Sequence, residues 1–307
     1  MGKFESWGYK YRNNPEYGYA AIWHDLLTIR VMANQPLPAA ASEFYDVSLG
    51  HKCNMHCPFC YTSAEFTGRQ YRRVVDKIQL LIHTIWRDPN YRPFQVAIGS
   101  EGEPTIHPEF IQALQTFHDN GIVPNYTTNG RIFTDHPHQW IPIVDATEKY
   151  CGGVALSAHE QNPYWQKAFE VLKFNTQVPI NLHLIVSDFK SLQYLEHIID
   201  LYDGRVHTFV ILPLIKAGRS TSGMTDAVYK KLVTILNKYQ NGRNQFAVGA
   251  RMNPWLLRED LPQPEHIQQF EPEMFSKNLI LDDTIRITPS SFDTHTTMWS
   301  IEYQGNL

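Results

Sequence analysis

The chain has 307 residues, of which 43% are apolar and 13% aromatic, enough to bury one large core without division into several domains. Its 27 basic and 31 acidic residues give a formal charge of −4 without runs of like charge, which argues against an extended nucleic acid or an anionic membrane as partner. The N-terminus lacks a signal pattern and no apolar stretch has the length of a membrane span. Three of the four cysteines are clustered, so we expect a cytoplasmic protein without a disulfide framework.

Residues 1–43 are predicted to form an N-terminal arm that packs on the rest of the protein. This region is rich in aromatic residues, continues with an amphipathic run at 24–32 and ends in a proline-rich stretch at 35–38. Aromatic side chains serve burial more often than recognition, so packing is the expected role and substrate recognition the alternative. The aromatic residues are Tyr9, Tyr11, Tyr17, Tyr19 and Trp23.

Residues 44–243 alternate between strand-like and helix-like segments, which indicates parallel βα units. Six such units predict the α/β class and a partial (β/α)6 barrel related to the TIM barrel. Such barrels carry their chemistry on loops at the carboxyl ends of the strands. The expected strands are 43–50, 94–98, 122–127, 153–156, 179–186 and 206–214, and the helices are 71–86, 107–120, 138–149, 162–175, 191–202 and 226–239.

Residues 244–307 are predicted to be a C-terminal extension, because the alternation weakens there. A strand is expected at 245–250, a proline-rich segment at 252–275 and a late strand at 279–288. We expect the part from Met252 onward to cover the open end of the barrel, and closure of the barrel's opposite end is the alternative. Its aromatic residues are Trp255, Phe270, Phe275 and Trp299.

One short loop concentrates the metal-binding chemistry of the chain. Cys53, Cys57 and Cys60 follow the first predicted strand with the spacing C-x3-C-x-Φ-C, in which Φ is an aromatic residue. Thiolates are soft donors that suit iron–sulfur clusters, and three of them leave one iron open to a substrate. The alternative is a non-enzymatic scaffold that binds zinc or a cluster, with His51 or His56 as the fourth zinc ligand.

The cysteine pattern resembles the signature of the radical S-adenosylmethionine (SAM) superfamily. This resemblance implies a [4Fe–4S] cluster on Cys53, Cys57 and Cys60, with the fourth iron bound by the amino and carboxylate groups of SAM. It further implies reductive cleavage of SAM to a 5'-deoxyadenosyl radical, which takes a hydrogen atom from a substrate carbon. The electron is expected from an external donor such as flavodoxin or ferredoxin.

A second stretch, at the end of the second predicted strand, resembles the superfamily's Gly-Gly-Glu-Pro motif. Gly102, Glu103 and Pro104 match this motif, and Glu101 stands where its first glycine usually lies. The resemblance implies that this loop receives the SAM ammonium group. A carboxylate suits that role, because its hydrogen bonds to an ammonium are charge-assisted.

Further residues at strand ends resemble SAM-contacting positions of the superfamily. Asn129 lies in a Thr-Asn-Gly turn, with an ordinary turn as the alternative, and Ser157 is expected near the SAM ribose or carboxylate. Backbone groups around Leu214 are expected near the adenine and Arg219 near a carboxylate, with a surface cation as the alternative for Arg219. His183 lies on an alternating strand, where a core role is more usual than a pocket role.

Two features bear on the reaction and its substrate. Cys151 is expected to be a buried, inert thiol at the barrel end opposite the cluster. Residues 276–291 resemble the hairpin of cysteine-rich extensions in peptide-modifying members but contain no cysteine, so a single-cluster enzyme is expected. A peptide or protein side chain is therefore the predicted substrate, and a nucleotide or nucleoside is the alternative.

Overall fold

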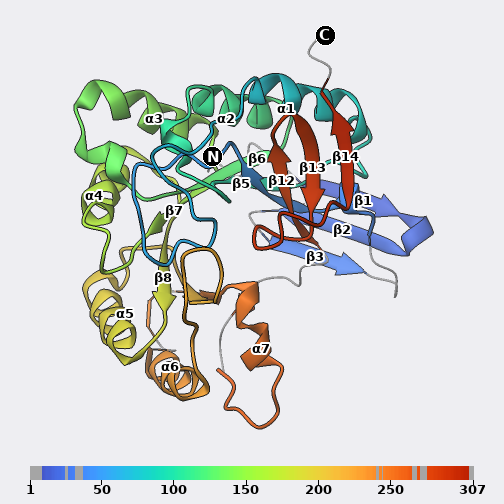
Figure 1. Cartoon of the computed structure of the whole chain (residues 1–307). Helices are drawn as coiled ribbons and strands as arrows, with labels where there is room; N and C mark the ends of the chain where they lie inside the picture. The colour runs from blue at the N-terminus through green and yellow to red at the C-terminus, as the bar shows by residue number, and fades with distance from the viewer. Residues whose placement is uncertain are drawn as a thin grey trace.

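A computed structural model describes residues 9–24, 27–31, 37–239, 242–243, 245–264, 268–269 and 275–303. A curved parallel sheet forms its centre (Figure 1). The predicted strands are present, and each pairs in parallel with its successor along the chain. They are β4 (Phe44–Ser48), β5 (Gln95–Ile98), β6 (Val123–Thr128), β7 (Gly153–Ser157), β8 (Ile180–Val186) and β9 (Thr208–Pro213).

Helices follow each of these strands and cover the outer face of the sheet (Figure 1). Their apolar side chains recur at helical spacing, as on the first helix, where residues 74, 78, 81 and 82 are buried. The predicted partial barrel is thereby confirmed, because the strand order is linear and does not close on itself. The helices are α1 (Val74–His83), α2 (Phe110–Asp119), α3 (Pro137–Tyr150), α4 (Trp165–Asn175), α5 (Phe189–Tyr202) and α6 (Asp226–Tyr239).

The inner face of the sheet is accessible to solvent. On β4, Tyr45 and Val47 are fully buried on the helix side, whereas Asp46 between them is partly exposed on the other side. β8 has the same alternation over its whole length. Because successive side chains of a strand point to opposite faces, this pattern describes a core under the helices and an open concave face.

The C-terminal residues extend the sheet at the edge of β4. β12 (Ser276–Leu281) pairs in parallel with β4, and β13 (Thr284–Thr288) and β14 (Trp299–Glu302) follow antiparallel. The prediction of one strand over 279–288 is therefore wrong. The chain turns at Asp282, whose Oδ1 accepts a hydrogen bond from the backbone N–H of Thr284 (3.2 Å), a turn that aspartate favours.

The opposite edge of the sheet carries β10 (Gln245–Val248), which pairs in parallel with β9, and β11 (Gln268–Gln269). The short helix α7 (Asn253–Leu256) follows β10, and Trp255 on it donates from Nε1 to Asp226 of α6 (3.1 Å). Trp299 packs against the main core from β14. Phe270 lies outside the described residues, and the covering role of the extension stays a prediction.

The N-terminal residues form a separate antiparallel sheet of β1 (Lys10–Asn14), β2 (Tyr19–His24) and β3 (Leu27–Val31). Tyr19 and Trp23 are buried against Phe94 and Phe275, so this sheet packs beside the amino ends of the barrel strands. Tyr9 and Tyr11 are exposed instead. Residues 25–26 and 32 of the amphipathic run and 35–36 of the proline-rich stretch lie outside the described residues.

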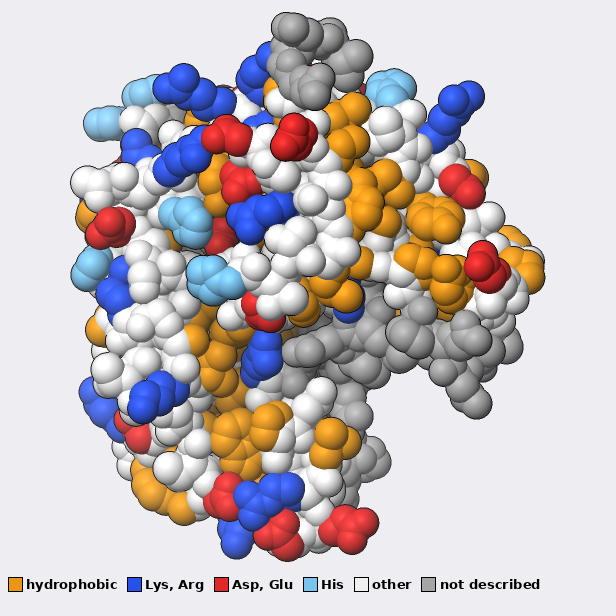
Figure 2. Space-filling view, turned by 45° about the vertical axis from the view of Figure 1, so that its right-hand side comes forward, with side chains coloured by type: hydrophobic (Ala, Val, Ile, Leu, Met, Phe, Trp, Pro, Cys, Tyr) orange, Lys and Arg blue, Asp and Glu red, His pale blue; other side chains and the backbone are white. Residues whose placement is uncertain are grey.

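Because the sequence has no runs of like charge, we expect a surface of mixed charge. On the face drawn in Figure 2, basic and acidic side chains are interspersed. None of the helices in the described part of the chain has the length and apolar character needed to cross a membrane.

Leu279, in the middle of β12, tests whether the C-terminal strands belong to the barrel core. It is in register with Val47 of β4 and is 0% exposed. Leu279→Ala is expected to lower the free energy of unfolding by about 2–5 kcal/mol, because a cavity replaces buried methyl groups. Denaturant titration followed by circular dichroism measures this change.

Leu257→Ala is the matched control, because Leu257 is 80% exposed. Its expected effect on the free energy of unfolding is below about 0.5 kcal/mol. Equal effects of the two substitutions would contradict a core role for β12.

Candidate cofactor site

The three clustered cysteines lie on the loop that follows β4, at the carboxyl end of the strands, where they were predicted. All three are partly buried. Backbone hydrogen bonds close the loop on itself, from Cys53 N to Glu65 O (2.9 Å) and from Tyr71 N to Leu49 O (2.9 Å). The loop is therefore a fixed platform rather than an extended connection.

Burial favours the protonated form of two of these thiols, Cys53 and Cys57. It raises the pKa of Cys53 to about 12, and the nearby Glu103 carboxylate adds to the effect. Burial also raises the pKa of Cys57, which Arg219 partly offsets. The thiolates that a cluster requires therefore need a strong positive partner, and bound metal supplies one.

Hydrogen-bond donors surround the sulfur atoms. Hydrogen bonds to sulfur ligands influence the reduction potential of iron–sulfur clusters. This donor set and the three soft ligands fit a cluster. His159 was not predicted, and its only sequence signal is its place two residues after the end of β7. The neighbours are the N–H of Met55 (3.4 Å) and Nδ2 of Asn129 (3.8 Å) at Cys53, Nε2 of His159 (3.8 Å) at Cys57, and Oγ1 of Thr62 (3.4 Å) at Cys60.

Among the described residues, no three His, Cys, Asp or Glu side chains converge on one metal ion, and this includes the three clustered cysteines. A cluster binds each thiolate through a different iron, whereas the zinc alternative needs four ligands on one ion. Of its two candidate ligands, His51 lies beside Glu101, with 3.6 Å between Nε2 and Oε2, and His56 is exposed.

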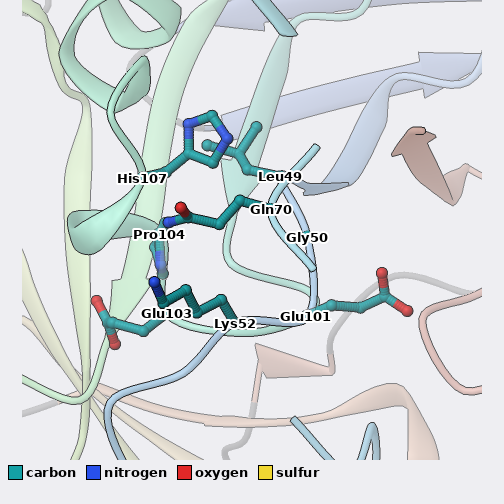
Figure 3. A pocket seen from close by; sticks show the side chains of 8 residues that line it. All are labelled: Leu49, Gly50, Lys52, Gln70, Glu101, Glu103, Pro104 and His107. Atoms are coloured by element: carbon teal, nitrogen blue, oxygen red, sulfur yellow. The ribbon is translucent and has the colours of Figure 1, made fainter. Parts of the chain in front are cut away.

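The Gly-Glu-Pro loop lies directly against the start of the cysteine loop (Figure 3). The N–H of Glu103 donates to the carbonyl of Lys52 (2.9 Å). Gly102 has a φ of +66°, and a Cβ at this position would lie 2.5 Å from the carbonyl oxygen of Gly50 and 2.6 Å from that of Lys52. Only glycine permits this conformation and this close approach together.

The Glu103 carboxylate accepts hydrogen bonds from neighbouring residues of the protein. It is 5% exposed. Its Oε1 accepts hydrogen bonds from the N–H (3.2 Å) and hydroxyl (2.7 Å) of Thr105 and from the hydroxyl of Thr128 (2.7 Å). Its Oε2 accepts one from the N–H of Asn129 (2.8 Å). Three of these four donors share Oε1 and one bonds to Oε2, whereas the roughly four lone-pair sites of a carboxylate are divided two to each oxygen. Burial raises its pKa, and these hydrogen bonds oppose that rise. Its contact with a SAM ammonium stays a prediction.

Glu101, at the position of the missing first glycine, ties two strand ends together. It is buried and its Oε2 accepts hydrogen bonds from the hydroxyls of Ser48, at the end of β4, and Tyr71 (3.4 Å). Its φ is not positive, so a side chain fits without backbone strain. The two carboxylates, Glu101 and Glu103, point away from each other (Figure 3).

Asn129 joins the end of β6 to the cysteine loop. Its Nδ2 donates to Oδ1 of Asn54 (2.8 Å), and its carbonyl accepts a hydrogen bond from Nδ2 of Asn162 (2.8 Å). The same amide of Asn162 donates to the carbonyl of Ser157 (2.8 Å). Asn129 therefore lies beside the cysteine loop, and Ser157 ends β7 on its partly exposed face. Their contacts with SAM stay predictions.

Arg219 contacts the cysteine loop, and the backbone of Leu214 is bonded to other protein groups. The guanidinium of Arg219 donates to the carbonyls of Cys57 and Ala64 (both 2.9 Å). Leu214 donates to Val186 (2.8 Å) and accepts from Met224 (2.9 Å) through its backbone. Their roles toward a carboxylate and an adenine stay predictions.

Cys151 is placed as predicted. It is 0% exposed and follows α3 just before β7 begins, at the barrel end opposite the cysteine loop. It is thus the one described cysteine outside the candidate site.

No family model and no curated protein sequence matches the chain. Among solved structures, SuiB of Streptococcus suis bound to S-adenosylmethionine matches with a TM-score of 0.60 and 13% identity, over 86% of this chain and 63% of SuiB. SuiB bound to the precursor peptide SuiA matches with a TM-score of 0.60 and 16% identity, over 84% of this chain and 62% of SuiB. The chain thus spans less than two thirds of SuiB. The fold that the radical SAM resemblance implies is confirmed.

Glu103→Gln tests whether this side chain organises the site. An amide offers one acceptor oxygen to the four donors and turns an NH2 group toward them, so buried donors lose their partners. The free energy of unfolding of the metal-free protein is expected to fall by about 1–3 kcal/mol, measured by denaturant titration.

Glu65→Gln is the control, because Glu65 is exposed on the neighbouring cysteine loop. It is expected to leave the free energy of unfolding within about 0.5 kcal/mol of wild type. Unchanged stability of Glu103→Gln would contradict a structural role of the carboxylate.

Proposed function

We propose that this protein is a radical SAM enzyme that binds one [4Fe–4S] cluster through Cys53, Cys57 and Cys60 and acts on a peptide or protein side chain. The observation that supports it most is the position of these cysteines. They share one closed loop at the carboxyl end of β4, in the fold of the SAM-bound SuiB. Parallel barrels bind their ligands at this end.

When bound, an iron–sulfur cluster with one open iron supplies the electron for reductive cleavage of SAM. The protein's own part is to bind and orient. Three thiols hold the metal, and the amide of Asn129 and the imidazole of His159 reach their sulfur atoms. Gly102 allows the second motif to approach the cysteine loop closely, so that both loops present their groups to one ligand.

A peptide substrate is favoured by the concave face of the sheet. None of the strands β4 to β9, all of them described, contains Lys or Arg. Phosphate recognition depends on such cations. Polar side chains that are partly exposed on this face, as with Asn125, Asn181 and Asp46, suit the donors and acceptors of peptide amides, and apolar residues such as Ala97 and Ile185 lie among them. Burial raises the pKa of Asp46 to about 7, so that near neutral pH it both donates and accepts. SuiB, which shares the fold, has been observed with a precursor peptide.

Cysteine substitutions test the cluster. Cys53→Ala, Cys57→Ala and Cys60→Ala are each expected to lose the cluster after anaerobic reconstitution, measured by iron and sulfide analysis and electron paramagnetic resonance. Cys151→Ala is the matched control and is expected to keep it, because Cys151 lies at the other end of the barrel. Stoichiometric zinc in anaerobically purified wild type, with no cluster on reconstitution, would contradict the proposal.

Deuterated substrate pools test the substrate class. The reconstituted protein with SAM and a reductant is incubated with peptides from digested deuterated protein or, separately, with deuterated nucleosides and nucleotides. Deuterium is expected in 5'-deoxyadenosine only with the peptides, and Cys53→Ala is expected to give none. Transfer from the nucleotide pool alone would favour the alternative substrate class.

A further inference from the structure

His159 makes two contacts with the cysteine loop that the proposed function leaves unexplained. Its Nε2 lies 3.8 Å from Sγ of Cys57. Its ring meets the ring of Phe59 edge-on, with the centroids 4.7 Å apart and an angle of 86° between planes. One imidazole from the end of β7 therefore touches both the middle cysteine and the aromatic residue of the motif.

The position of His159 is fixed by its surroundings. The residue is 7% exposed, and the N–H of Asn162 donates to its carbonyl (2.9 Å). The preceding residue, Ala158, donates its N–H to the carbonyl of His183 on β8 (2.9 Å). Backbone and ring are therefore both held, and the approach to Cys57 does not depend on a free side chain.

The proton of the imidazole can be assigned from the partners of its two nitrogens. Nδ1 is buried and has no hydrogen-bond partner among the described residues, whereas Nε2 faces the sulfur of Cys57. A buried N–H without an acceptor is rarer than a buried acceptor without a donor. The proton therefore belongs on Nε2, and Nδ1 carries the lone pair.

We infer that His159 is a positioning residue that donates its Nε2–H to the Cys57 thiolate and thereby raises the reduction potential of the bound cluster. This inference rests on the proposed cluster. Reduction adds negative charge, part of which resides on the sulfur ligands, and an N–H directed at a sulfur stabilises the reduced form more than the oxidised form. The contact with Phe59 keeps the ring aimed at that sulfur.

Two substitutions separate the hydrogen bond from packing. His159→Leu fills similar space beside Phe59 without a donor, and His159→Gln retains an N–H donor near the position of Nε2. His197→Gln controls for the loss of a histidine away from the site, because His197 is exposed on α5. All proteins are reconstituted anaerobically, and iron and sulfide content is measured first.

The readout is the midpoint potential of the cluster, from a redox titration followed by electron paramagnetic resonance. His159→Leu is expected to keep its iron and to lower the ratio of reduced to oxidised cluster about tenfold at a fixed potential, a shift of about 59 mV for one electron. His159→Gln is expected to restore most of this shift, and His197→Gln is expected to leave the potential at its wild-type value.

Three results would overturn the inference. A wild-type potential in iron-replete His159→Leu would show that the contact does not influence the cluster. Direct coordination of a histidine nitrogen, seen as hyperfine coupling that disappears in His159→Leu, would make His159 a metal ligand instead. Failure of wild type to assemble any cluster would refute the proposed function and this inference together, whereas the first two results leave the proposed function intact.

Discussion

The candidate site depends on the close approach of two loops at the carboxyl ends of β4 and β5. The Gly-Glu-Pro loop can reach the cysteine loop because Gly102 carries no side chain at a point where two carbonyl oxygens would lie 2.5 and 2.6 Å from a Cβ. Once the loops meet, the N–H of Glu103 bonds to the cysteine loop and its carboxylate gathers donors from Thr105, Thr128 and the turn at Asn129. Backbone conformation, rather than a charged contact, thus brings the motifs together.

Two buried carboxylates hold the ends of the strands together, a role that the motif alone does not suggest. Glu101 and Glu103 point in opposite directions, and each joins strand ends that are separate in sequence. A buried carboxylate is stable only when donors satisfy it, so each one enforces the position of the groups around it. The residue that replaces the first glycine of the motif therefore adds a connection to β4 and causes no strain.

The concave face and the extended sheet edges define the space around this site. Strand β12 covers the edge of β4 with buried side chains, and the loop after β13 places Phe292 against Tyr61, next to Cys60, with ring centroids 4.3 Å apart. The C-terminal residues are therefore both part of the core and neighbours of the cysteine loop. Because the inner residues of the strands stay partly exposed, the sheet leaves its concave side accessible to a ligand.

The sequence by itself determined the order of the βα units, the loop that carries the three cysteines and its place at the carboxyl end of a strand. These features follow from periodicity and spacing within short stretches, which local side-chain chemistry fixes. Strand patterning did not divide residues 279–288 into two strands, although residues 276–291 resembled a hairpin, and no sequence signal showed that His159 reaches Cys57. Only the tertiary structure decided which donors meet the sulfurs and which groups occupy Glu103 and Arg219. Four of those contacts join residues separated by 25 to 162 positions, and the packing of strands and helices, not any local pattern, brings such residues together.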